Sequence, residues 1–293
     1  MITTIKSDAL TVKSKTDGAA LTSIVADGVE YLWQGDPNFW ANQAPVCFPI
    51  VGSLRDNRAQ CGAGEMKGLA RHGFAKFMEF EVGALEDDCV AYVLKSSEET
   101  KALYPYDFTF TMAYKVTGKT LSFIYKVKNE GDVVMPFHVG GHPGYNCPLF
   151  EGEAFEDYEI QFEKEEDANL MYPMADAPSL LDDANRRMIL DHESVLKLDH
   201  GYFHNDGLFF DTMNSRSLKY VNPSTGKGLQ IDFPQFMNLV LWTTAKPATF
   251  ICIEPWVGMC TCSTDDDVFE HKANIQYCEP GEEKEYIVNV TVL

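Results

Sequence analysis

The sequence predicts an all-β protein, a large antiparallel β-sandwich formed by a single domain over residues 1–293. Three observations lead to this class. Short runs that alternate apolar and polar side chains recur along the chain, glycine or proline turns separate them, and no amphipathic helix or strand-helix-strand alternation appears. The length of 293 residues and the hydrophobic content of 45% suit one large all-β domain.

The chain opens with short strands joined by polar turns. Asp17-Gly18 and Asp27-Gly28 are sequences typical of tight hairpin turns. We therefore expect an antiparallel meander over residues 2–33, with strands at 9–13, 20–25 and 29–33.

Two loops then offer charged side chains. Residues 44–58 form an apolar run bracketed by prolines that leads to Arg55, whose guanidinium can donate two hydrogen bonds to vicinal hydroxyls or a carboxylate. In residues 67–76, His72 precedes a glycine and lies between Arg71 and Lys76. Both side chains could bind a ligand. The alternative for Arg55 is a solvated surface position, and the alternative for His72 is a histidine hydrogen-bonded within its own loop.

The clearest alternation follows the second loop. Residues 107–116 and 121–129 flank a glycine turn and predict a hairpin with one buried face, after a strand-like run at 77–82. This hairpin leads directly into the turn that contains His142.

His142 lies between backbone breakers. Gly140 and Gly141 can adopt dihedral angles closed to other residues, and Pro143 restricts the residue before it. The backbone therefore aims the imidazole, whose unperturbed pKa of ~6.5 suits general acid–base catalysis near neutrality. The alternative is a core histidine satisfied by one hydrogen bond.

The acidic region, residues 150–200, is predicted to form solvated loops or a short helical turn without a catalytic role. Strands resume beyond it. They are predicted at 208–210, 229–233, 239–242, 250–258 and 285–293.

Glu254 is a carboxylate inside the apolar run 250–258. In apolar surroundings an ionised Glu must be paired, or its pKa rises until it becomes a usable acid or base near pH 7. Because Pro255 cannot donate the next ladder hydrogen bond, Glu254 is predicted at a strand end. Glu254 and His142 together are a predicted acid–base pair.

The formal charge of −20 argues against nucleic-acid and anionic-membrane partners and favours a neutral ligand. The N-terminus has no secretory apolar region, and no apolar run approaches the ~20 residues of a membrane span. We therefore expect a cytoplasmic protein whose eight cysteines are reduced. Neither Cys260-Thr261-Cys262 nor His138 with His142 has a spacing diagnostic of a metal site, so we predict no metal.

Seven short motifs occur in an order that gives the chain a family resemblance. They are Phe48-Pro49-Ile50-Val51-Gly52, His72-Gly73-Phe74-Ala75, Tyr104-Pro105-Tyr106, Gly140-Gly141-His142-Pro143-Gly144-Tyr145-Asn146, Asn205-Asp206, Ile253-Glu254-Pro255-Trp256 and Glu279-Pro280-Gly281-Glu282. Over nearly its full length the chain resembles the aldose 1-epimerase (galactose mutarotase) family, in its LacX-like branch.

The resemblance implies the galactose mutarotase-like β-supersandwich and a cofactor-free isomerase that interconverts the anomers of a free aldose on the concave face of the large sheet. It implies that Glu254 is the general base and His142 the general acid. His72, Asp206 and an arginine of the first loop are implied to bind the sugar.

Arg55 is the candidate for that arginine, although in many relatives the arginine stands closer to the glycine, where this chain has Ser53. Trp242, Trp256 and Tyr145 offer apolar faces to the C–H surface of a sugar, with a core position as the alternative for each.

Two alternatives to an epimerase of free aldoses remain. A related branch acts on hexose 6-phosphates and carries arginines where this chain has Asn42-Gln43-Ala44-Pro45 and Lys76. Arg71 and Lys76 could hold a phosphate as point charges, but the arginine fork is missing, so a free aldose is favoured. The other alternative is a carbohydrate-binding protein without turnover, against which Glu254 and His142 both argue.

Overall fold

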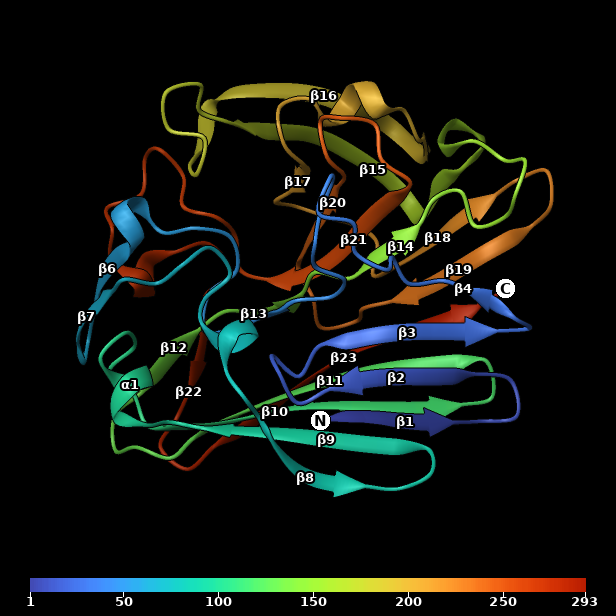
Figure 1. The fold of residues 1–293 in the computed structure, drawn as a ribbon. Coiled ribbons are helices and arrows are strands. Elements are labelled where there is room, and N and C mark those ends of the chain that lie inside the picture. Colours follow the sequence, from blue (N-terminus) through green and yellow to red (C-terminus); the bar gives the residue numbers. More distant parts are fainter.

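The computed structural model describes residues 1–293 and consists almost entirely of antiparallel strands (Figure 1). This confirms the predicted all-β class. The helices are α1 (Glu98–Lys101) and the 3₁₀ helices η1 (Arg55–Asn57), η2 (Ala75–Phe77), η3 (Phe155–Asp157), η4 (His200–Phe203) and η5 (Phe269–His271). None of them has the length and apolar character needed to cross a membrane.

The strands form four sheets. The N-terminal sheet has the order β1 (Ile2–Lys6), β2 (Thr11–Lys15), β3 (Leu21–Ala26), β4 (Val29–Glu30). The large sheet has the order β5 (Val46–Cys47), β13 (Val139–Gly141), β21 (Phe250–Val257), β20 (Asn238–Trp242), β17 (Leu208–Phe210), β15 (Glu159–Pro173), β18 (Ser217–Asn222), β19 (Lys227–Asp232), β23 (Glu283–Val292), β11 (Thr120–Asn129), β10 (Phe108–Thr117), β9 (Cys89–Lys95), β8 (Glu81–Leu85). Two further strands join it, β14 (Gly144–Asn146) on β21 and β16 (Leu181–Lys197) on β15. The two small ribbons are β6 (Arg58–Cys61) with β7 (Gly64–Lys67), and β12 (Met135–Phe137) with β22 (Gln276–Cys278).

The N-terminal sheet packs on the β9–β10 part of the large sheet (Figure 1). The hydroxyl of Tyr92 on β9 hydrogen-bonds to the hydroxyls of Thr3 and Ser14. Tyr114 on β10 donates to the carbonyl oxygen of Ala19 at 2.8 Å. Buried tyrosines therefore join the two layers in addition to the apolar core.

The predicted hairpin and the predicted meander are confirmed, but the meander has an additional first strand, β1, and its last strand ends at Glu30 instead of residue 33. β1 pairs with β2, β2 with β3 and β3 with β4, all antiparallel. β10 and β11 pair from Phe108 opposite Asn129 to Thr117 opposite Thr120. Residues of β11 alternate between buried and half-buried, as a strand with one face on the core requires.

Two expectations about secondary structure are wrong. Most of the acidic region forms β15 and β16, the two longest strands, which pair as the long hairpin at the top of Figure 1. Its charged side chains are mostly exposed while Ala168 and Leu170 are buried, and several β-bulges interrupt the period of two that would have revealed the strands. Residues 77–82 are not one strand, because Phe77 ends η2 and β8 begins at Glu81.

Glu254 does not lie at a strand end. It is the fifth of eight residues in β21, which pairs with β20 on one side and with β13 and β14 on the other. Ile253 donates its N–H to the carbonyl oxygen of Pro143 at 3.3 Å, so Pro255, two residues on, faces the same side. In this register Pro255 lies opposite Gly141, whose carbonyl oxygen accepts the indole N–H of Trp256 at 3.2 Å. The missing N–H of Pro255 therefore leaves no unpaired acceptor and does not end β21.

Gly140 permits the close packing of β13 on β21. It lies opposite Trp256, and a Cβ atom at Gly140 would stand 2.6 Å from Cδ1 of the indole. The indole is 1% exposed and donates its Nε1–H to the carbonyl oxygen of Gly141 at 3.2 Å. This contact fixes the strand that leads into His142.

We expect Gly140→Ala to lower the free energy of unfolding by about 1–3 kcal/mol, because the methyl group must displace a packed indole. Urea denaturation measures the change. Gly131→Ala is the control, since a Cβ atom there would meet its nearest neighbour at 3.4 Å and should change the stability by less than about 1 kcal/mol. Equal losses in the two variants would contradict the assigned role of Gly140.

Candidate active site

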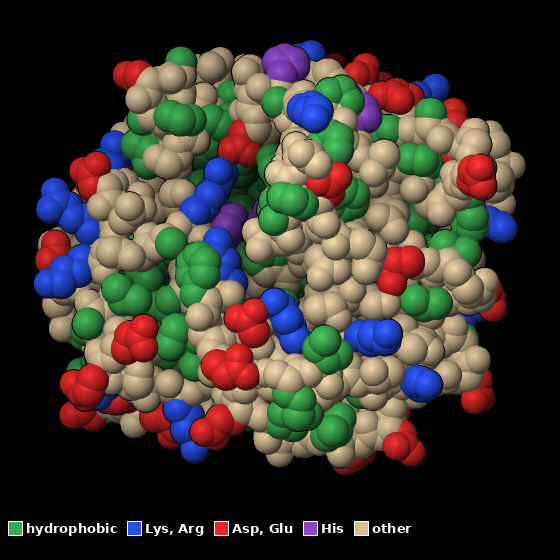
Figure 2. All heavy atoms as spheres, in the orientation of Figure 1, with side chains coloured by type: hydrophobic (Ala, Val, Ile, Leu, Met, Phe, Trp, Pro, Cys, Tyr) green, Lys and Arg blue, Asp and Glu red, His purple; other side chains and the backbone are tan.

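A pocket of about 250 Å³, called here the central pocket, opens on the face of the large sheet that carries Glu254. Figure 2 shows a hollow in which Lys or Arg, His, and Asp or Glu side chains lie together. Seven of the eight predicted site residues line the central pocket: Arg71, His72, Lys76, His142, Asp206, Trp242 and Glu254. Arg55 is the exception.

The register of the sheet places His142 directly opposite Glu254. Gly140 pairs with Trp256 on one side of the strand break and Gly144 pairs with Cys252 on the other, in the same register. Directly opposed residues of antiparallel strands project to the same face. Nε2 of His142 accordingly lies 3.5 Å from Oε1 of Glu254.

Both members of this pair are buried, with His142 9% and Glu254 1% exposed. Burial raises the pKa of the Glu254 carboxyl well above its ordinary value, although the Arg71 guanidinium acts in the opposite direction. Burial and the charge of Arg71 lower the pKa of His142 to about 3. Both shifts favour the uncharged forms of the two groups, a protonated carboxyl and a neutral imidazole, which together hold one exchangeable proton.

Several buried polar atoms of the central pocket have no hydrogen-bond partner within the protein. They are both carboxylate oxygens of Glu254, Nδ1 of His142 and Nε of Arg71. Native proteins satisfy nearly all such atoms, because each unmatched group costs about 1–3 kcal/mol. The cluster is suited to a ligand that brings its own hydroxyl groups.

The backbone around His72 sets the tautomer of its imidazole. His72 has a φ of 68°, and Gly73 follows with a φ of 74°, where a Cβ atom would lie 2.2 Å from the carbonyl oxygen of Phe48. Nδ1 of His72 accepts the N–H of Gly52 at 3.1 Å. Burial lowers the pKa of His72 well below its ordinary value, so the neutral ring carries its hydrogen on Nε2 and can donate it.

Arg71 and Asp206 form a charged pair at the edge of the central pocket, with Nη2 of Arg71 at 2.9 Å from Oδ2 of Asp206. Burial lowers the pKa of Arg71, but the carboxylate of Asp206 outweighs it and the guanidinium stays charged. Burial lowers the pKa of Lys76 from its ordinary value, and no carboxylate lies within ion-pair distance of its Nζ.

Aromatic side chains surround the imidazole of His142. Trp40 stacks on it with ring centroids 4.9 Å apart, and Trp242 packs edge-on at 5.4 Å. Trp242 was expected here, and Trp256 also lines the central pocket. Five lining residues were not expected: Trp40, Asn42, Pro45, Phe209 and Val240. Val240 lies opposite Glu254 on β20, and Phe209 lies opposite Val240 on β17. Only the strand register, which the sequence analysis did not predict, could have placed these two residues in the pocket.

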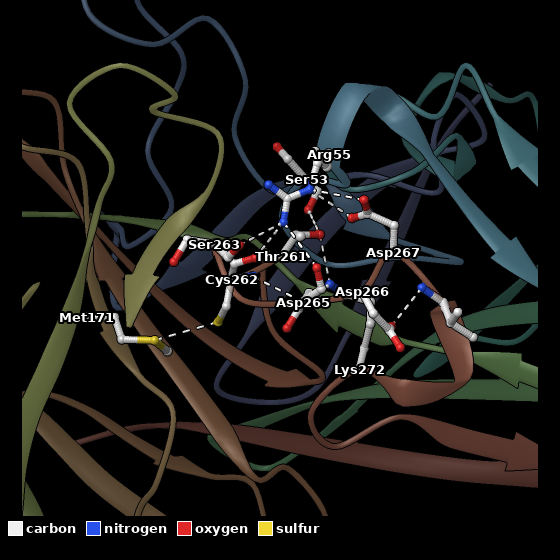
Figure 3. Close-up of polar contacts among 11 residues, drawn as sticks. Ser53, Arg55, Met171, Thr261, Cys262, Ser263, Asp265, Asp266, Asp267 and Lys272 are labelled. Carbon is white, nitrogen blue, oxygen red and sulfur yellow. Dashed lines mark hydrogen bonds and ion pairs between the residues drawn. The ribbon is translucent and has the colours of Figure 1, made fainter. Parts of the chain in front are cut away.

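Arg55 has other partners (Figure 3). Its Nε donates to both carboxylate oxygens of Asp267 at 2.9 and 3.1 Å. Its Nη2 donates to the carbonyl oxygens of Cys262, Ser263 and Asp265 at 3.1, 3.1 and 3.3 Å. The structure therefore uses Arg55 to hold the segment 262–267, and Arg71 is the arginine that reaches the central pocket.

The side chains that could hold a metal ion at this site are His142, Cys252 and Glu254, whose ligand atoms lie within 4.8 Å of one another. Burial raises the pKa of the Cys252 thiol well above its ordinary value, which disfavours the thiolate that a metal requires. His138 does not join them. It is fully buried against the ring of Phe269, with neither ring nitrogen hydrogen-bonded. This donor set favours proton transfer over metal binding.

Comparison with known proteins identifies relatives over the whole chain. The model of a family described as aldose 1-epimerase matches residues 1–277. The plasmid LacX protein of Lactococcus lactis subsp. lactis is 37% identical over 295 residues, which span 99% of this chain and 98% of that protein. The chromosomal LacX protein of the same organism is 36% identical with the same coverage.

Two solved structures share the fold. One is the X-ray structure of a galactose mutarotase related enzyme from Lactobacillus acidophilus, with a TM-score of 0.91 and 28% identity over 100% of this chain and 97% of that chain. The other is a galactose mutarotase-like protein from Lactobacillus casei ATCC 334, with a TM-score of 0.90 and 25% identity over 100% of both chains. These matches confirm the galactose mutarotase-like fold.

We expect Glu254→Gln to stabilise the protein in a pH-dependent way. In the folded protein the pKa of Glu254 lies well above its ordinary value of 4.5, whereas the unfolded chain releases the proton near that value. Above pH 4.5 the wild type should therefore lose stability relative to the variant by about 1.4 kcal/mol per pH unit, until the folded pKa is reached.

Thermal or urea denaturation of both proteins between pH 4 and pH 9 measures this difference. Below pH 4.5 the two curves should run parallel. A difference that does not change across this range would contradict burial of a protonated Glu254.

Proposed function

The chain belongs to the aldose 1-epimerase family, and from this membership we propose that it interconverts the α and β anomers of a free aldose. The observation that carries the proposal is the 3.5 Å separation between Nε2 of His142 and Oε1 of Glu254, which both line the central pocket. The unmatched polar atoms around this pair support a ligand rich in hydroxyl groups.

The reaction needs two proton transfers at oxygens bonded to one carbon. A base removes the proton of the C1 hydroxyl while an acid protonates the ring oxygen, the bond between C1 and the ring oxygen breaks, and an open-chain aldehyde forms. Rotation about the C1–C2 bond exposes the other carbonyl face, and the reverse transfers close the ring. Because both oxygens belong to C1, the acid and the base must lie close together, as Glu254 and His142 do.

We propose Glu254 as the base and His142 as the acid of ring opening. This assignment requires a carboxylate and an imidazolium, which hold the same single proton as the neutral pair of the unliganded protein. The positive charge of Arg71 favours the carboxylate but disfavours the imidazolium, so the attraction between the two opposite charges 3.5 Å apart has to stabilise this form. Ring closure reverses both transfers, so the pair returns to its starting state after each turnover.

The remaining polar groups would bind the other hydroxyls of the sugar. His72 donates from Nε2, Arg71 from its unpartnered Nε, and Asp206 accepts. Trp40 and Trp242 present apolar rings to the C–H surface of the sugar while they hold the imidazole in place.

A hexose 6-phosphate is the second candidate substrate. Lys76 favours it, because this cation lines the central pocket without a carboxylate partner. The net charge of −20, the pairing of Arg71 with Asp206, and the neutral residues Asn42 and Pro45 at the pocket wall favour a free aldose.

We expect the protein to accelerate the relaxation of optical rotation of freshly dissolved α-glucose or α-galactose, and we expect Glu254→Gln and His142→Gln each to lower kcat by roughly 10²–10⁴-fold. Polarimetry with free and phosphorylated aldoses measures the rates, and Glu279→Gln, an exposed carboxylate outside the pocket, is the control. No acceleration with any of these sugars would refute the proposal. Calorimetric binding without acceleration would support a carbohydrate-binding protein.

Arg71 and Arg55 should respond differently to substitution. Removal of a charge-assisted hydrogen bond to substrate is worth about 1.5–3 kcal/mol, so Arg71→Ala should raise KM by roughly 10–100-fold. Arg55→Ala should leave KM within about twofold of wild type and lower the melting temperature, because its partners are Asp267 and backbone carbonyls. A KM increase confined to Arg55→Ala would reverse the two assignments.

A further inference from the structure

Lys76 is the unpaired cation of the central pocket. Its ammonium group forms no hydrogen bond or ion pair with the rest of the chain, and it lies 4.8 Å from the ring centroid of Phe77. Arg71, the other cation of the pocket, is neutralised by Asp206, whose Oδ2 lies 2.9 Å from Nη2. Burial favours the protonated form of Glu254. The charge of Lys76 is therefore not balanced by any residue that lines the central pocket.

A neighbouring cavity supplies no counter-ion for Lys76 either. This cavity, of about 350 Å³, shares Lys76, Asn42 and Pro45 with the central pocket. Its one carboxylate belongs to Asp17, whose Oδ2 lies 2.6 Å from Nζ of Lys15. Because burial already lowers the pKa of Lys76, the fold holds this cation where a bound anion would stabilise it.

The order of strands places Lys76 on the His142 side of the catalytic pair. Lys76 belongs to η2, which packs on β5, and Ala75 of η2 donates its N–H to the carbonyl oxygen of Phe48 at 3.2 Å. From β5 the large sheet continues through β13 to β21. His142 follows β13 and Glu254 lies in β21, so His142 stands between Lys76 and Glu254.

The other charged groups lie toward the opposite side. Asp206 precedes β17, which follows β21 and β20 in the sheet, and it pairs there with Arg71. The electrostatic effects have the same order. Burial raises the pKa of Glu254, and the charges that act on it are those of Arg71 and Asp206. Burial, Arg71 and Lys76 lower the pKa of His142. The free cation is thus beside the acid of ring opening.

The assigned proton transfers orient a sugar ring along this row of groups. Glu254 receives the proton of the C1 hydroxyl, and His142 protonates the ring oxygen. C5 is bonded to the ring oxygen on the side away from C1, and C5 carries C6. A ring that satisfies both transfers therefore directs C6 toward the end of the pocket that contains Lys76.

We propose that the central pocket isomerises hexuronic acids, aldoses with a carboxylate at C6, and that Lys76 binds this carboxylate. This inference rests on the proposed function and names its substrate class. The carboxylate is ionised at neutral pH and accepts hydrogen bonds from an ammonium group. Its single negative charge balances the single positive charge that the pocket leaves unpaired.

A phosphate at C6 fits this end of the pocket less well. A phosphate monoester carries a charge of about −1.5 to −2 at pH 7 and three acceptor oxygens, which suit an arginine fork. Beside Lys76 the wall offers the uncharged Asn42 and Pro45, and Arg71 is paired with Asp206. The net charge of −20 also repels a second negative charge.

A bound carboxylate would also assist the reaction. The positive charge of Lys76 opposes protonation of His142, whereas the acid of ring opening has to be an imidazolium. A carboxylate paired with Lys76 offsets that charge at the moment when the proton is needed. The preference for a hexuronic acid should therefore appear in kcat as well as in KM.

Four sugars that differ only at C6 test the inference. Xylose lacks C6, glucose has a hydroxymethyl group, glucuronate a carboxylate and glucose 6-phosphate a phosphate ester. We expect kcat/KM for glucuronate to exceed that for glucose by about tenfold or more. Polarimetry of freshly dissolved anomers measures all four, after the spontaneous rate of each sugar is subtracted.

Variants of Lys76 identify the group responsible. Lys76→Met should lower the ratio of the glucuronate value to the xylose value by about tenfold or more, whereas Lys76→Arg, which retains the charge, should preserve most of it. A ratio within one variant cancels any general effect on the pocket. Lys115→Met is the matched control, because it removes the same charge from an exposed position on β10, outside the central pocket.

Calorimetry with the Glu254→Gln variant gives a readout that does not depend on turnover. Glucuronate should bind about tenfold more tightly than glucose, and the added Lys76→Met substitution should remove this difference. If no sugar is isomerised but this preference is present, the proposed function fails and the carboxylate site stands.

Equal values for glucose and glucuronate, with no effect of Lys76→Met on their ratio, would overturn the inference and leave the proposed function intact. A higher kcat/KM for glucose 6-phosphate than for glucuronate would also overturn it, because the end of the pocket at Lys76 would then be suited to a phosphate dianion.

Discussion

The candidate site depends on two titratable side chains that are buried directly opposite each other, His142 between β13 and β14 and Glu254 within β21. Opposed residues of an antiparallel pair have Cβ atoms roughly 4.5–5.5 Å apart, so the sheet itself sets the separation of the pair and no loop has to move. His142 lies in the break between β13 and β14, and the N–H of His142 donates to the carbonyl oxygen of Pro45 at 2.9 Å. The carbonyl oxygen of Gly141, opposite Pro255, accepts the indole N–H of Trp256, so Pro255 occupies the middle of β21 without an unpaired acceptor.

This arrangement is unfavourable for the empty protein and useful for proton transfer. Burial drives Glu254 and His142 toward their uncharged forms, and both carboxylate oxygens of Glu254 and Nδ1 of His142 lack partners in the fold. A rigid surrounding must hold such groups, and here two tryptophans against the imidazole and the paired strands β20 and β21 do so. Stability is therefore given up at the position where the chemistry needs two proton-transfer groups.

The candidate site could be predicted where a residue was unusual in its local sequence. His142 stood between backbone breakers and Glu254 stood in an apolar run, and both reach the central pocket. The choice between Arg55 and Arg71 had no local signal, because it depends on partners such as Asp267 and Asp206 that are distant in the chain. Trp40 had none either, since it lies in a loop and its ring stacks on His142 and Phe250, which are distant in the chain.

The sequence by itself determined the all-β class, the N-terminal meander and the β10–β11 hairpin, because alternation with period two and glycine turns act over a few residues. Only the tertiary structure decided that His142 opposes Glu254, that the acidic region forms β15 and β16, and that Arg55 holds a loop. The contact of Arg55 joins residues more than 200 positions apart, the β15–β16 pairing is interrupted by bulges, and the opposition of His142 and Glu254 depends on the register of strands far apart in the chain. That register is set by how side chains pack across the completed sheet, and no short stretch of sequence encodes it.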